Sequence, residues 1–83
     1  AGPVLAQMIR ARIDRMLSPS LGALARLATS YRAAVERLVP KGAARRAFWG
    51  EFFAGAPARA MEIGSFEEAQ AAADELLARR GVV

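Results

Sequence analysis

One apolar stripe, enclosed by two proline-containing breaks, constrains the fold of this chain more than any other feature. Between the breaks, apolar residues recur at helical spacing and fall within an arc of roughly 120° on a helical wheel. These residues are Leu21, Leu24, Leu27, Ala28, Tyr31, Val35, Leu38 and Val39. Ser18-Pro19-Ser20 offers a hydroxyl to cap the start, and Pro40-Lys41-Gly42 ends the hydrogen-bond ladder. The pattern predicts a long amphipathic helix with Leu24 and Tyr31 at the centre of a core.

Three further helices are predicted around that stripe. Pro3 suits the first turn of a helix over residues 3–17, and residues 43–54 form a shorter one. Ser65 starts the last helix as a capping box, in which Glu68 is expected to reach back to the Ser65 amide. The expected buried stripe of this helix consists of Phe66, Ala69, Ala73, Leu76 and Leu77.

The fold class follows from the residues that fill these segments. Ala, Leu, Arg and Glu favour helices, and the β-branched residues are too scattered to build a sheet. A single turn is expected over residues 58–63, with Met61 and Ile63 as apolar plugs. We therefore predict an all-α, compact bundle of about four short helices with up-and-down topology. Residues 1–83 form one domain, which we expect to be a fragment of a longer bacterial protein, because the chain starts with Ala and is rich in Arg and poor in Lys.

The residue types leave little room for catalysis. The chain has no histidine and no cysteine, so the groups that most often titrate near neutral pH are absent. Glu67 and Glu68 are neighbours in sequence, but neighbouring side chains on a helix point about 100° apart and do not converge. No EF-hand loop or phosphate-binding loop is present. We expect no catalytic residue, no metal site and no small-molecule cofactor, and therefore no enzyme activity in this domain.

Arg12 is the most informative charged residue because it interrupts an apolar face. On the helix over residues 3–17 it lies between Met8 and Met16 along one row. An unpaired buried guanidinium is costly, so Arg12 must reach solvent, pair with an acid such as Glu51 or Glu62, or lie on a docking surface. The sequence leaves these alternatives open.

The aromatic residues form a second candidate surface. Phe48, Trp49, Phe52 and Phe53 share one broad face of the helix over residues 43–54. Most of this cluster is expected to fill the core, and Trp49 is the residue expected to be partly exposed. Arg45 lies one turn before Trp49 and is expected to pack on the indole as a cation–π pair.

The charge distribution favours anionic partners for the first part of the chain. Residues 1–60 hold ten basic and three acidic residues, a net charge of +7, whereas residues 61–83 carry −3. The candidate contacts to nucleic acid or another anion are Arg26, Arg37, Lys41, Arg45 and Arg46. Arg26 and Arg37 share one outer row of their helix, but Arg10 and Arg15 point well apart on theirs. No recognition helix is visible either, so any such binding would be independent of nucleotide sequence.

Three functions remain, in order of preference. The first is a non-catalytic interaction domain that binds a protein partner or a second copy of itself. Its tentative contact residues are Met8, Arg12, Met16, Trp49 and Phe53. The second is nucleic-acid binding, and the third is attachment to an anionic membrane surface through Trp49 and Phe53. The longest apolar stretch, Phe52 to Ala58, is too short for a transmembrane segment, and we expect the protein in the cytoplasm.

Overall fold

The protein is built from helices throughout the part that the structure describes. The computed structural model describes residues 3–16 and 18–82, without the side chains of residues 11 and 13–16. The helices in these residues are α1 (Pro3–Met16), α2 (Pro19–Leu38), α3 (Ala43–Ala54), α4 (Ala56–Glu62) and α5 (Phe66–Arg80). The predicted all-α class is confirmed. The segment expected to form a single turn over residues 58–63 belongs, up to Glu62, to α4, which has 7 residues.

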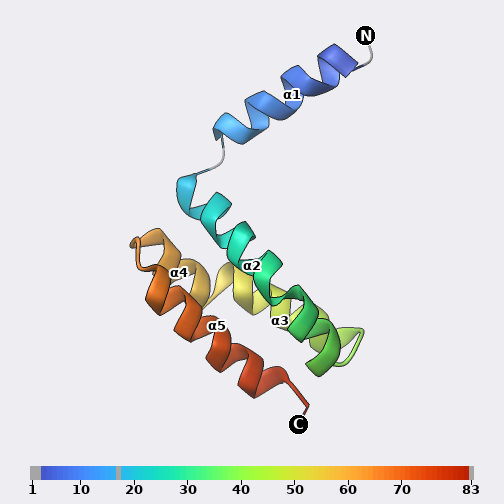
Figure 1. Ribbon diagram of the computed structural model, residues 1–83, viewed down its shortest axis with the longest axis vertical. Coiled ribbons are helices and arrows are strands. Elements are labelled where there is room, and N and C mark those ends of the chain that lie inside the picture. Colours follow the sequence, from blue (N-terminus) through green and yellow to red (C-terminus); the bar gives the residue numbers. More distant parts are fainter. Residues whose placement is uncertain (1–2, 17, 83) are drawn as a thin grey trace.

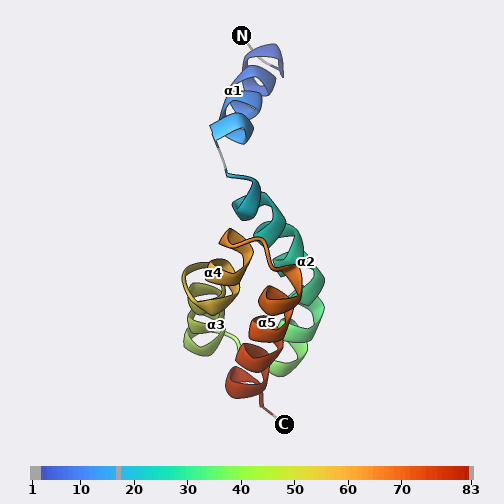
Figure 2. The ribbon, with the colours of Figure 1, turned by 90° about the vertical axis from the view of Figure 1, so that its left-hand side faces the viewer.

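The bundle consists of α2 to α5, and α1 stands apart from it. In Figure 1, α2 and α5 run downward, while α3 and then α4 lead back up between them. Figures 1 and 2 both show α1 extending beyond the end of α2. Among the described residues, α1 contacts no other helix. The expectation that the helix over residues 3–17 packs in the bundle is therefore wrong, and α4 takes the fourth place.

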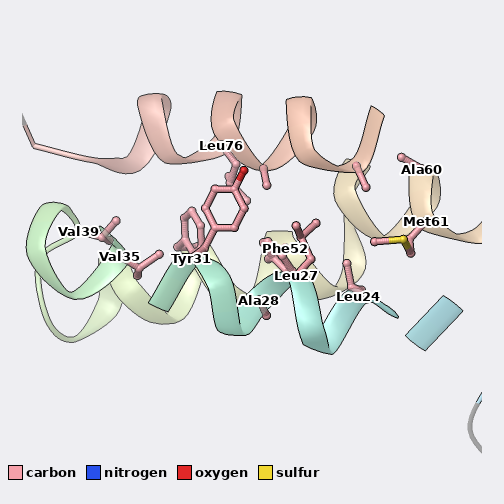
Figure 3. Packing of buried hydrophobic residues seen from close by; sticks show 13 residues of the cluster. Leu24, Leu27, Ala28, Tyr31, Val35, Val39, Phe52, Ala60, Met61 and Leu76 are labelled. Carbon is pink, nitrogen blue, oxygen red and sulfur yellow. The ribbon is translucent and has the colours of Figure 1, made fainter. Parts of the chain in front are cut away.

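The core lies between α2 and the other three helices of the bundle (Figure 3). Its largest fully buried side chains are Phe48, Phe52, Leu76, Val35 and Val39. Leu24 and Tyr31 are buried, as the apolar stripe predicts. Among the side chains that the structure describes, every buried one of the core comes from residues 24–76, and none from α1.

Tyr31 links α2 to α5 through its hydroxyl group. The Oη atom donates toward Asp74 Oδ1 at 2.5 Å and lies 3.2 Å from the Gln70 carbonyl oxygen. The ring packs on Phe52, with 6.2 Å between ring centroids. Burial, followed by the hydrogen bond to Asp74 and its charge, raises the pKa of Tyr31 above its usual value. The residue is a structural tie between helices.

Two serine caps set the starts of α2 and α5, as predicted. The Ser18 hydroxyl accepts a hydrogen bond from the Leu21 amide at 3.2 Å, and the Ser65 hydroxyl accepts one from the Glu68 amide at 3.2 Å. The second half of the expected capping box is absent from this pair. The Ser65 amide donates instead to the Ala60 carbonyl oxygen at 3.0 Å, which ties the start of α5 to α4.

Ile63 and Phe66, which were expected in the core, are exposed. Ile63 is 74% exposed because α4 ends at Glu62 and the chain turns at Gly64, where φ is +82°. Phe66 is 55% exposed because it is the first residue of α5, at the open end of the bundle. Both predictions were wrong because helical spacing does not say where the neighbouring helices end.

Candidate functional site

The first candidate surface is the apolar face of α1. Its exposed members are Val4, Leu5, Met8 and Ile9, which are between 51% and 66% exposed. Their spacing of one, three and four residues places them on one side of the helix. Arg12 follows one turn after Met8 and is also exposed. The predicted contact residues Met8 and Arg12 therefore share one face, whereas the Met16 side chain lies outside the described residues.

This face needs a partner for physical reasons. A helix as short as the 14 residues of α1 is only marginally stable in water without tertiary packing. A contiguous apolar face of this kind is also unusual on the surface of a monomer. Among the described residues no helix of the bundle packs on α1, so the bundle does not supply such tertiary packing.

The second candidate surface is a groove at the end of the bundle where α2 begins. One hollow of about 180 Å³ is lined by Ser18, Ser20, Leu21, Leu24, Phe53, Ala58 and Glu62. A second hollow of about 530 Å³ is lined by Pro19, Ser20, Ala23, Met61, Glu62, Gly64 and Phe66. Ser20 and Glu62 line both, so we treat the two hollows as one surface, the end groove. It combines exposed apolar side chains with one central carboxylate.

The two aromatic residues proposed as contacts differ in their exposure to solvent. Phe53 is exposed and lines the end groove. Trp49 is half-buried, and its ring packs on Phe48, Phe52 and Phe53 with centroid distances of 4.9 to 6.1 Å. Trp49 is thus partly exposed, as expected, and Phe53 is the more exposed ring because it faces the open end of the bundle.

The basic residues form a separate surface at the opposite end of α2. Lys41, Arg45 and Arg46 surround a shallow hollow of about 540 Å³ together with Trp49. Arg45 does not make the predicted cation–π contact. Its Nη2 atom donates to the carbonyl oxygens of Glu36 at 3.1 Å and Val39 at 3.0 Å, which caps the last turn of α2.

The other predicted anion contacts are spread along α2. Arg26 and Arg37 are exposed on its outer side, with the length of several turns between them. Lys41 and Arg46 are also exposed. The structure therefore brings Lys41, Arg45 and Arg46 together but leaves Arg26 and Arg37 outside that group.

Glu51, the acid first suggested as a partner of Arg12, forms ion pairs with other arginines. Glu51 pairs with Arg80 through Oε1 and lies 3.6 Å from Arg79 through Oε2. These contacts join α3 to the last turn of α5. Glu62, the other acid suggested, is exposed in the end groove.

Several surface residues were not identified from the sequence as contacts. Leu21 and Phe66 were assigned to buried faces, yet both line the end groove. The available signal was their place in the first turn of a helix, where fewer neighbours cover a side chain. Among residues 3–16 and 18–82, no three His, Cys, Asp or Glu side chains gather as a metal site would require. The described helices include none long and apolar enough to cross a membrane.

Comparison with known proteins identifies the bundle. Residues 20–77 match the family described as the sirohaem synthase dimerisation region. Siroheme synthase of Azotobacter vinelandii is 44% identical over 68 residues, which are 82% of this chain and 15% of the relative. Siroheme synthase of Methylobacillus flagellatus is 37% identical over 79 residues, 95% of this chain and 17% of the relative. The chain thus spans about one sixth of the length of these relatives.

No solved structure matches the chain. The family match, however, decides between the functional classes. The matched residues contain all of α2, apart from Pro19, and all of α3 and α4, together with most of α5. The prediction of a helical interaction domain is confirmed by this match, and the nucleic-acid and membrane alternatives are not favoured. The chain belongs to the family of sirohaem synthase dimerisation regions.

Proposed function

We propose that this chain is the dimerisation region of a bacterial siroheme synthase, and that its partner is a second copy of the same chain. The observation that carries the proposal is the exposed apolar face of α1, which no helix of the bundle covers within the described part of the chain. The relatives are enzymes by name, and catalysis in such a protein would belong to parts outside this chain. Residues 1–83 would form one helical unit that holds two such proteins together in the cytoplasm.

The contact is proposed to include Met8, Arg12 and Met16 from α1 and Phe53 from the bundle. Transfer of apolar side chains out of water is the main favourable term in most association, and each well-buried side chain contributes about 1.5–3 kcal/mol. A symmetric dimer uses each contact twice, so a modest face can still hold two copies. Trp49, which is half-buried among other rings, would support Phe53 rather than touch the second copy.

The test is the mass of the particle in solution as a function of concentration. Size-exclusion chromatography with light scattering should give a mass twice the 8.9 kDa of one chain. Ile9→Glu should shift the particle to a monomer, because a charge in an apolar contact is costly to bury. Val82→Glu is the matched control, since Val82 is also an exposed aliphatic residue and lies at the other end of the molecule.

The outcomes separate the parts of the proposal. A wild-type protein that remains monomeric up to millimolar concentration would refute dimerisation by this chain. If Ile9→Glu remains dimeric, the dimer forms through the bundle and α1 has no part in it. Binding to oligonucleotides at low salt through Lys41 and Arg46 stays a prediction, and it should disappear as salt rises.

A further inference from the structure

We infer that two copies of this chain exchange their α1 helices, so that α1 of each copy lies in the end groove of the other, with Arg12 facing Glu62. The inference rests on the proposed dimerisation and names the surface that receives α1. Two exposed apolar surfaces without a partner are present, one on α1 and one on the bundle. In a symmetric exchange each copy would cover both of them.

The apolar side chains of α1 and of the end groove are of types that pack well against each other. The face of α1 offers one aliphatic and thioether stripe, from Val4 to Ile9. The end groove offers exposed rings and an aliphatic residue, namely Phe53, Phe66 and Leu21. Hollows flanked by aromatic rings suit branched and flexible aliphatic side chains, as in other cases where an amphipathic helix lies in an apolar groove.

The charges are complementary as well. Residues 3–12 carry Arg10 and Arg12 and no acid. Glu62 is exposed and lines both hollows of the groove. Arg12 continues the apolar row one turn after Met8, so a helix seated on the groove by that row also directs its guanidinium into the groove. A carboxylate there removes the cost of a charged side chain on an apolar contact face.

The length of α1 favours a second copy over the chain's own groove. Residues 4–9 lie about 10–18 Å along the helix from its end at Met16. The groove begins directly after α1, at Ser18 to Leu21. If α1 folded back on its own bundle, the side chains of residues 4–9 would lie about 10–18 Å beyond Ser18 to Leu21, and could not pack on that part of the groove. A second copy approaching head to head has no such restriction.

The family match supports the groove as an interface. The residues that line it from Ser20 to Phe66 lie within the matched dimerisation region, whereas α1 precedes that region. The groove therefore belongs to the part of the chain that the family description links with dimerisation. In the proposed exchange, the occupant of the groove is α1 of the second copy.

The experiment is a charge exchange between two variants of the full chain. Arg12→Glu alone and Glu62→Arg alone should each weaken dimerisation by about tenfold to a hundredfold, because two contacts per dimer turn from attraction to repulsion. When the two variants are mixed, Glu at position 12 of one copy meets Arg at position 62 of the other, and the second contact keeps its wild-type residues. The mixture should recover affinity close to wild type and contain heterodimers.

Native mass spectrometry and analytical ultracentrifugation measure both quantities, and Glu36→Arg is the matched control. Glu36 is an exposed acid on the outer side of α2, away from the groove, so its reversal should neither weaken the dimer nor rescue Arg12→Glu. If both single variants weaken the dimer but the mixture does not recover, the exchange is refuted. If neither single variant weakens the dimer, the groove is not the receiving surface, while the proposed dimerisation stands. A wild-type monomer would refute both.

Discussion

A variant that begins at Ser18, and so lacks α1, should separate the stability of the bundle from the stability gained by association. Every buried core residue among the described side chains lies between Leu24 and Leu76, so we expect the loss of α1 to leave this core in place. At concentrations well below the dissociation constant of the proposed dimer, the two proteins should therefore differ by no more than about 0.5 kcal/mol in free energy of unfolding, as surface changes do.

At high concentration the two proteins should differ strongly. A partner present at about 100 times its dissociation constant stabilises the folded state by roughly 2.7 kcal/mol. For a domain of this size, each kcal/mol shifts the melting temperature by about 4–8 °C. The wild-type melting temperature should thus rise by about 10–20 °C between dilute and concentrated solution. The variant without α1 should show no such rise.

Circular dichroism melts over a hundredfold or wider range of protein concentration provide the assay. The reasoning fails if the variant is markedly less stable than the wild type in dilute solution, since α1 would then pack on its own bundle. It also fails if the melting temperature of the variant rises with concentration as steeply as that of the wild type. In that case the bundle alone would supply the association.

Three further predictions concern the bundle. Leu24→Ala should lower the free energy of unfolding by about 2–5 kcal/mol in chemical denaturation, because Leu24 is buried in the core. Arg45→Ala should cost about 1.5–3 kcal/mol in the same assay, since it removes a charged donor to the carbonyl oxygens of Glu36 and Val39, and Arg45→Lys should not restore it fully. Tyr31, the one tyrosine of the chain, should ionise at higher pH than free tyrosine when followed by absorbance at 295 nm. Because its pKa is raised in the folded protein, the stability it contributes is complete below its unfolded value of about 10 and decreases as pH rises above that value; an unshifted titration would contradict this.

Local signals predicted the bundle well where the residue itself sets the backbone. The serine at position 18 caps α2 because its hydroxyl is the nearest acceptor for the Leu21 amide, whatever surrounds the helix. Residues 43–54 form α3 with the expected bounds because Gly42 and Gly55 flank them on both sides. These features depend on neighbours in sequence, and a sequence contains that information directly.

The candidate site was harder to predict because it depends on which apolar helix faces are buried against other helices and which remain exposed. The apolar face of α1 and the stripe of α2 have the same helical spacing, yet one is exposed and the other is the centre of the core. Spacing identifies a face that must be covered but not the surface that covers it. Arg45 illustrates the same point, since its position one turn before Trp49 allowed a cation–π contact, and the end of α2 supplied stronger acceptors.

The position of α1 also couples its folding to association. A helix of 14 residues pays for nucleation without enough internal hydrogen bonds to offset it, so a large share of unbound copies should have α1 frayed. Only the helical form presents Met8, Ile9 and Arg12 on one side, and the measured affinity is reduced by the fraction that is helical. Exposed Gln7→Ala should therefore tighten the dimer by raising helix propensity. The same change should leave the dilute melting temperature of the bundle unchanged, because Gln7 is exposed and takes no part in the core. A dimer no tighter than wild type would mean that α1 is already fully helical before the two copies meet.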